Sequence, residues 1–178
     1  MDPFHVVALA GAKLDLCRQR VQQDTRGHRG RAGDPLYRAR RTLRTRTALL
    51  TSRQRTRLEA VFADEAHAPV EVTWLVYQQI ITAYDAHPDP REGKTLLARV
   101  IDSLRAGVPA GLDELATLGR TLQRRRDDVL AYFSHRASNG PTEAINGRLE
   151  ALRRNALGFR NLINYRIRSL LHCGSLAL

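Results

Sequence analysis

The spacing of apolar residues predicts a long helix near the start of the chain. Apolar residues recur at intervals of three and four over residues 5–24, which places them on one face of an α-helix. They are Val7, Ala10, Leu14, Cys17 and Val21. The polar residues Arg18, Gln19 and Gln22 are expected on the opposite face. Residues 27–33 contain three glycines and two arginines, a composition that predicts a basic loop.

Capping signals predict two further helices. Asp34 precedes Pro35, so the aspartate can cap a helix whose first turn holds the proline. The buried stripe of this helix is Leu36, Ala39 and Leu43. A second helix starts at Thr51 and Ser52, and an acidic break at residues 64–69 ends it. Its apolar side is Leu58, Val61 and Phe62.

The middle of the chain continues this helical pattern. Residues 70–86 contain enough β-branched residues to form a strand, but the length of the apolar run favours a helix. Its expected inner side is Val72, Leu75, Val76, Gln79, Ile80 and Ala83. Turns at residues 87–90 and 107–111 enclose another helix, whose apolar residues are Leu97, Val100, Ile101 and Leu104. Residues 112–133 are predicted as one long helix.

Two helices are predicted at the C-terminus. Ser138-Asn139-Gly140-Pro141 signals a helix start, because proline loses no hydrogen bond in a first turn. One face of this helix holds Ile145, Leu149, Leu152 and Ala156. Gly158 interrupts it, and the last helix carries Leu162, Ile163, Ile167, Leu170 and Leu171. The whole chain is therefore expected to be mainly α, with about seven helices and almost no strand.

Positive charge is concentrated at the two ends of the chain. There are 29 Lys and Arg residues against 18 Asp and Glu, and only two of the cations are lysines. Residues 1–60 hold 14 bases and 5 acids, residues 61–136 hold 9 and 11, and residues 137–178 hold 6 and 2. Basic ends are typical of a protein that binds a polyanion. Solvated helix faces that keep the protein soluble explain the same excess, and composition leaves both interpretations open.

The cysteines and the hydropathy pattern indicate the compartment. Cys17 and Cys173 lie too far apart in sequence for a spaced metal motif or a disulfide framework, which is typical of a reducing cytoplasm. No apolar stretch approaches the ~20 residues that span a bilayer. Asp2 stands where a signal peptide would be positive. We therefore expect a cytoplasmic protein without a membrane segment.

Two blocks of the sequence match a known combination of motifs. The first is Ser138-Asn139-Gly140-Pro141-Thr142-Glu143, followed by Gly158-Phe159-Arg160-Asn161. The second is Asp2-Pro3-Phe4-His5-Val6-Val7 with the amphipathic helix behind it. Together they resemble insertion-sequence transposases of the DDE type, most closely the ISL3 family. Asp34-Pro35-Leu36-Tyr37, Arg40, Arg41, Trp74 and the basic C-terminal helix also resemble parts of that family, so the resemblance spans essentially the whole chain.

The resemblance implies an RNase H-like fold and DNA cut-and-join chemistry. It makes Glu143 the last of three catalytic carboxylates and Asp2 the second. Such carboxylates hold two Mg²⁺ ions, one activating the attacking oxygen and the other stabilising the leaving oxygen. Asp2 and Glu143 are therefore the expected catalytic and metal-binding residues, and Mg²⁺ is the expected cofactor. From the residues alone, Glu143 also suits a helix-capping carboxylate and Asp2 an ordinary terminal residue.

The expected DNA-binding residues lie mostly in the C-terminal region, where few acids offset the arginines. They are Arg148, Arg153, Arg154, Arg160, Asn161, Arg166, Arg168 and Trp74. Trp74 is the only tryptophan and could stack on a base. A core position between Val72 and Leu75 is the commoner situation for such a residue. For each arginine, a solvated helix face is the alternative.

The sequence departs from the family pattern because the first catalytic aspartate, its strands and the N-terminal DNA-binding region are absent. We expect a C-terminal fragment: residues 1–25 carry the second aspartate and its helix, residues 26–136 form a helical insertion, and residues 137–178 carry the glutamate helix and a basic helix. The central sheet would be largely missing, and the chain would be a truncated transposase, inactive alone, that binds DNA and pairs with itself or an intact transposase. The alternative is a small basic nucleic-acid-binding or regulatory protein that acts with an intact transposase.

Overall fold

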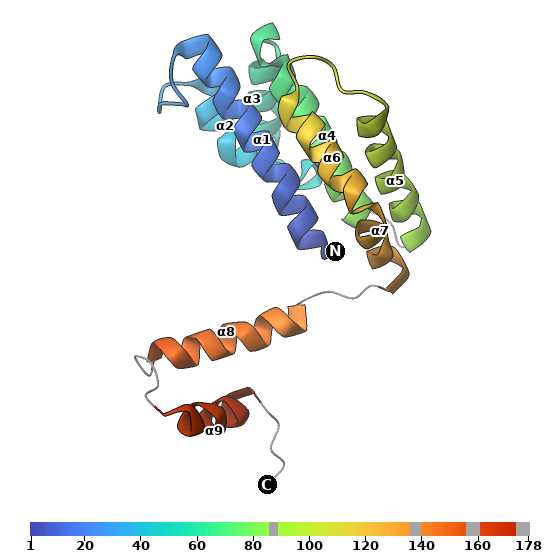
Figure 1. The fold of residues 1–178 in the computed structure, drawn as a ribbon. Helices are drawn as coiled ribbons and strands as arrows, with labels where there is room; N and C mark the ends of the chain where they lie inside the picture. Colours follow the sequence, from blue (N-terminus) through green and yellow to red (C-terminus); the bar gives the residue numbers. More distant parts are fainter. Residues whose placement is uncertain (86–88, 136–139, 156–160, 174–178) are drawn as a thin grey trace. The chain divides into compact units, whose positions relative to one another are not determined.

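The computed structural model describes residues 1–85, 89–135, 140–155 and 161–173, and all regular secondary structure within these ranges is helical (Figure 1). The mainly α prediction is therefore confirmed. The chain divides into a first unit, Met1–Arg136, and a second unit, Ala137–Leu178. Each unit is described by itself. No helix in the described ranges has both the length and the apolar character needed to cross a membrane.

The described part of the first unit is a bundle of seven α-helices and two short 3-10 turns. The helices are α1 Pro3–Arg26, α2 Pro35–Leu43, α3 Ser52–Phe62, α4 Ala68–Asp85, α5 Pro90–Ala106, α6 Asp113–Arg124 and α7 Arg126–His135, and the turns are η1 Thr47–Leu49 and η2 Glu65–His67. Helix α1 packs on α4 and α6, α5 packs on α4, α6 and α7, and α2 packs on α3. Helix α1 therefore lies between α2 on one side and α6 on the other (Figure 1).

The predicted helix starts in this unit are confirmed. The Asp34 carboxylate accepts the Leu36 N–H at 2.9 Å, and Pro35 follows it at the first helical position. Thr51 and Gln54 form a reciprocal capping box at the start of α3. These interactions satisfy N–H groups that a helix leaves without internal partners.

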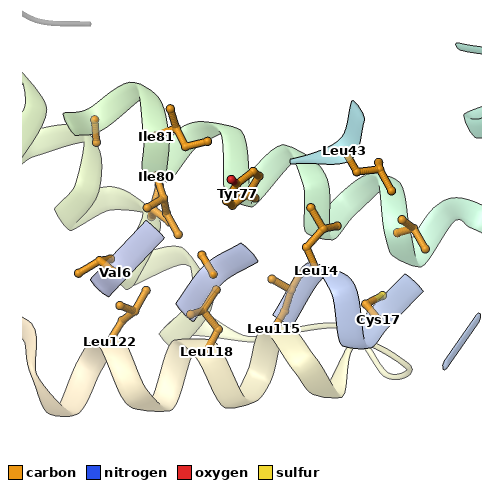
Figure 2. Close-up of a cluster of buried hydrophobic side chains, with 14 of the residues drawn as sticks. Val6, Leu14, Cys17, Leu43, Tyr77, Ile80, Ile81, Leu115, Leu118 and Leu122 are labelled. Carbon is orange, nitrogen blue, oxygen red and sulfur yellow. The ribbon is translucent and has the colours of Figure 1, made fainter. Parts of the chain in front are cut away.

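The core of the first unit forms where α1, α4 and α6 meet (Figure 2). Val6, Leu14, Ile80, Leu115 and Leu122 are almost completely buried there. Burial of each such side chain contributes roughly 1.5–3 kcal/mol. The stripe predicted for α1 is confirmed at Ala10, Leu14, Cys17 and Val21, while Val6 rather than Val7 completes it.

The outward placement predicted for Arg18 and Gln22 is wrong. Their side chains are buried, with exposed fractions of 5% and 0%. Arg18 donates to the side-chain oxygen Oε1 of Gln22, and Gln22 Nε2 donates to Asp34 Oδ2 at 2.5 Å. Because Asp34 comes from the start of α2, the packing of α2 on α1 encloses these polar groups and supplies their partners.

The inner face predicted for α4 is also partly wrong. Val72, Leu75 and Gln79 are exposed, and the buried positions of α4 are instead Val70, Thr73, Tyr77, Gln78, Ile80, Ile81 and Ala83. Apolar residues occur on most sides of this helix, so its periodicity does not select one face. Contact with α1 selects it, and Thr73 Oγ1 lies 3.5 Å from Cys17 Sγ there.

The single helix predicted over residues 112–133 is two helices, α6 and α7, that break at Arg125. The Arg126 guanidinium donates to both oxygens of Asp102 in α5, at 2.6 and 3.1 Å. Val129 and Phe133 are buried, and α7 packs on α5. These contacts with α5 turn the chain away from the axis of α6.

The second unit consists of α8 Gly140–Asn155 and α9 Leu162–Cys173, which pack on each other. Helix α8 begins within the predicted start signal. Leu162, Ile163 and Ile167 on α9 are exposed, with fractions of 62%, 65% and 51%. The predicted break at Gly158 and part of the turn at residues 87–90 lie outside the described residues.

Candidate catalytic carboxylates and nucleic-acid interface

Asp2 caps the N-terminus of α1. Its backbone is extended, Pro3 takes the first helical position, and Asp2 Oδ1 accepts the Phe4 N–H at 2.8 Å. The Met1 amino group donates to the backbone carbonyl of Asp128 in α7, so this end of α1 is attached to the bundle. The positive end of the helix dipole favours a negative charge at this position. Asp2 is therefore an oriented carboxylate in the first unit.

An aromatic cluster lies close to Asp2. The ring of Tyr84 stacks on Phe133 at 5.3 Å between centroids, and Tyr132 meets Tyr84 edge-on at 5.6 Å. Burial raises the pKa of the Tyr84 phenol, and the charges of Tyr132 and Asp2 act in the same direction. Sequence reasoning missed this cluster. Its residues come from the end of α4 and the end of α7, and only the packing of those helices brings them together.

Glu143 lies in the first turn of α8, three residues after Gly140. Its side chain is outside the part described. One turn further along, a Cβ added to Gly147 would meet no atom within 4 Å, so this flank of α8 is open. Asp2 and Glu143 belong to different units, and the described residues contain no group of three side chains able to hold a metal ion.

The predicted arginines of the second unit are exposed on α8 and α9. Arg153 and Arg154 lie 3.5 and 3.6 Å from the carboxylate of Glu150. The sequence prediction did not include this partial neutralisation of their charge. In the described part of the chain, no carboxylate pairs with the side chains of Arg148, Arg166 and Arg168. Exposed ion pairs stabilise a protein by only about 0–1 kcal/mol, so Glu150 holds Arg153 and Arg154 only weakly. Arg160 lies outside the described residues.

The other two predicted DNA-binding residues have structural surroundings. Asn161 Oδ1 accepts the Ile163 N–H at 2.8 Å and so caps the start of α9. Trp74 is half-buried on α4 in the first unit, with its ring 5.4 Å from that of Phe62. It lines an open cavity of about 480 Å³ between α3 and α4. Trp74 is thus partly a core residue and partly a cavity wall.

Comparison with known proteins gives one family. Residues 1–169 match the family of ISL3-type DDE transposases, whose description is "Transposase". The transposases for insertion sequence element IS1557 from two strains of Mycobacterium tuberculosis, CDC 1551 and H37Rv, are each 30% identical over 181 residues. These alignments cover 90% of this chain and 39% of each relative. The chain thus spans about two fifths of the length of these transposases.

A second similarity is shorter. A Lactococcus lactis protein named ATP-dependent protease is 34% identical over 59 residues, which cover 33% of this chain and 19% of that protein. No solved structure matches the chain.

Proposed function

Because the chain belongs to the ISL3 family of DDE transposases, we propose that it works in DNA transposition and supplies two catalytic carboxylates, Asp2 and Glu143, for strand cleavage and transfer. The observation that carries this proposal is the family match over residues 1–169, which includes both acidic motifs. The IS1557 transposases align over 90% of the chain and support the same role.

The surroundings of Asp2 suit a metal ligand. Carboxylate oxygens are what Mg²⁺ prefers, and the Phe4 N–H and the start of α1 fix the orientation of this carboxylate. When bound, the metal ions activate the attacking oxygen and stabilise the leaving oxygen. The role of Asp2 is to hold such an ion with one oriented oxygen.

Glu143 supplies the second carboxylate. Its position in the first turn of α8 puts its charge at the favourable end of the helix dipole. The open flank at Gly147, one turn further along α8, leaves room for a DNA backbone to approach. In the whole protein, these two acids act with a third carboxylate, as the DDE family name implies.

The exposed arginines of the second unit position the DNA. Arg148 lies on α8, and Arg166 and Arg168 lie on α9. A guanidinium fork matches two phosphate oxygens, so these residues suit backbone contacts that carry no sequence information. We therefore propose phosphate binding by the second unit next to Glu143.

The test is strand cleavage of duplex DNA by the longest gene product that contains residues 1–178. Glu143→Gln and Asp2→Asn remove a charge from a metal ligand, and each is expected to lower Mg²⁺-dependent cleavage at least about a hundredfold, because even outer-shell partners of metal ligands contribute 10–100-fold. DNA binding should stay unchanged. Asn is as good a helix cap as Asp, so Asp2→Asn preserves the start of α1.

Glu150→Gln is the matched control, because it removes an exposed carboxylate from the same helix. It should keep cleavage within about threefold of the unsubstituted protein. Normal cleavage by Glu143→Gln, or an equal loss in Glu150→Gln, would show that Glu143 is not the catalytic acid. Salt-dependent DNA binding without cleavage, even by the unsubstituted protein, would replace the catalytic role with a regulatory one.

A further inference from the structure

Positive charge is far denser in one stretch of the first unit than in the second unit. Residues 26–57 contain eleven arginines and one acid, Asp34. That acid faces inward, with an exposed fraction of 2%. Its Oδ2 accepts from Gln22 and its Oδ1 accepts the Leu36 N–H. The single carboxylate of this stretch therefore does little to neutralise its outer surface.

Some of these arginines already have carboxylate partners. The ion pairs are Arg44 with Asp15 at 2.9 Å, Arg46 with Asp85 at 2.6 Å and Arg26 with Asp34 at 3.8 Å. Two other arginines donate to backbone carbonyls: Arg40 to Tyr37 and Arg55 to Thr47, both at 2.9 Å. Arg40 also lies over the Tyr37 ring at 4.1 Å. These five side chains are held by the fold.

Four arginines on two adjacent helices have no carboxylate within ion-pair distance in the part of the chain described. They are Arg38 and Arg41 on α2 and Arg53 and Arg57 on α3, and we call them the α2–α3 cationic surface. Arg57 is half-buried and the other three are exposed. A spacing of three on α2 and of four on α3 puts each pair on one side of its helix.

The two helices that carry this surface are firmly placed. They pack on each other and lie side by side in Figure 1. Gln78 of α4 fixes the connection between them, because its side chain accepts the Thr47 N–H at 3.0 Å and donates to the Thr45 carbonyl at 2.9 Å. The backbone positions of the four arginines are therefore set before any ligand binds, which lowers the entropic cost of binding.

The dimensions of the surface suit a DNA duplex. Helix α2 has nine residues and is about 13 Å long, and packed helices lie about 8–10 Å apart. Arg38 and Arg41 are about 4.5 Å apart along α2, and Arg53 and Arg57 are about 6 Å apart along α3. The backbones of the four arginines therefore lie within a distance comparable to the ~12 Å width of the major groove, whose edges are lines of phosphate. The Tyr37 ring, the aromatic group of α2, is already covered by Arg40. That favours the duplex over a single strand, which needs aromatic rings for stacking.

We propose that the α2–α3 cationic surface binds the phosphate backbone of double-stranded DNA, as a contact distinct from the arginines of α8 and α9. This inference rests on the proposed function, because it takes DNA as the partner. It adds a DNA contact to a helical part of the chain that carries neither catalytic carboxylate.

The experiment measures binding of the 178-residue chain to a labelled duplex of about 25 base pairs and arbitrary sequence over a series of salt concentrations. One variant changes Arg38, Arg41, Arg53 and Arg57 to Gln. The control changes Arg91, Arg99, Arg120 and Arg124, exposed arginines of α5 and α6, to Gln. Both variants remove four charges from a formal net charge of +11. A third variant changes Arg148, Arg166 and Arg168 to Gln.

Loss of four phosphate contacts should reduce the slope of log K against log salt by about 3.6 and weaken binding at low salt at least about tenfold. The α5–α6 control should change the slope by less than about 1. Each of two double variants, Arg38→Gln/Arg41→Gln and Arg53→Gln/Arg57→Gln, should give about half the reduction in slope. If the fourfold variant unfolds at a lower temperature than the unsubstituted chain, the double variants test the inference in its place. Circular dichroism checks that each variant is folded.

Equal weakening by the α2–α3 variant and the α5–α6 control would overturn the inference, because net charge alone would then explain binding. A loss confined to the α8–α9 variant would overturn it as well and would leave the proposed DNA partner intact. If the unsubstituted chain shows no salt-dependent duplex binding, the proposed DNA partner itself fails.

Discussion

The two units differ in the burial of the apolar side chains that the structure describes, because all the buried ones belong to the first unit. In the first unit, Leu14, Leu97 and Leu122 have no exposed surface. In the second unit, α9 leaves more than half of the Leu162 and Ile163 side chains exposed. Small bodies bury a smaller share of their surface than large ones do, which limits the core that they can build. The first unit therefore has a core of its own, whereas none of the side chains described on α8 and α9 is buried.

The difference bears on the proposed site because one carboxylate comes from each unit. Asp2 is a helix cap attached to a packed bundle, while Glu143 lies on a helix whose described side chains are exposed or half-buried. The comparison can be tested by paired substitutions, one in each unit.

The largest expected effect comes from truncating a core leucine. Leu14→Ala should lower the free energy of unfolding of the first unit by about 2–5 kcal/mol, because it leaves a cavity between α1, α4 and α6. Ile167→Ala on the exposed face of α9 should change stability by less than about 0.5 kcal/mol. Urea unfolding followed by the fluorescence of Trp74, the only tryptophan, reports Leu14→Ala in the first unit, and urea unfolding followed by circular dichroism of the whole chain reports Ile167→Ala. Similar losses in the two variants would mean that the second unit has a comparable core.

A pair of glycine substitutions should give effects of opposite sign. In Gly93→Ala the added Cβ would lie 2.3 Å from the Ala83 carbonyl oxygen and 2.7 Å from Phe133, so α4 and α5 must separate at a cost of about 1–3 kcal/mol. In Gly147→Ala the added Cβ meets nothing, and α8 should gain about 0.5–1 kcal/mol of helix stability. Thermal unfolding tests the first variant, and helix content by circular dichroism tests the second. A stabilising Gly93→Ala would contradict the close packing of α4 on α5.

A smaller effect should come from the ion pair between α1 and α6. The Arg20 guanidinium donates to both carboxylate oxygens of Glu114, at 2.8 and 3.0 Å, and holds the pKa of that carboxyl below its usual value of 4.5. The resulting stabilisation is complete above pH 4.5 and is lost as the pH falls through the lower folded-state pKa. Glu114→Gln should cost about 1–2 kcal/mol at neutral pH, since the pair is partly screened by solvent.

The same substitution should flatten the acid dependence of first-unit unfolding. Urea titrations at several pH values below 5 would measure this, with Trp74 fluorescence as the readout. An unchanged acid dependence in Glu114→Gln would mean that other carboxylates, such as Asp102 paired with Arg126, determine it.

The sequence by itself determined the helix starts and the candidate acids. A cap depends on residues within about four positions of each other, so Asp34 with Pro35 and Thr51 with Gln54 could be identified locally. The motifs around Asp2 and Glu143 indicated the family, which the comparison over residues 1–169 confirmed. The catalytic roles of the two acids stay predictions, because the structure describes their units separately.

Only the tertiary structure decided which helix faces are buried. Gln22 is buried because α2 packs on α1 and brings Asp34, at the start of α2, to the Gln22 side chain. Thr73 of α4 points inward because α4 packs on α1, where Thr73 contacts Cys17. The break between α6 and α7 likewise goes with the contact of Arg126 with Asp102. Periodicity reports that a helix has an apolar face. Which face is covered, and which polar groups receive partners there, depends on residues that the chain brings together only when it folds.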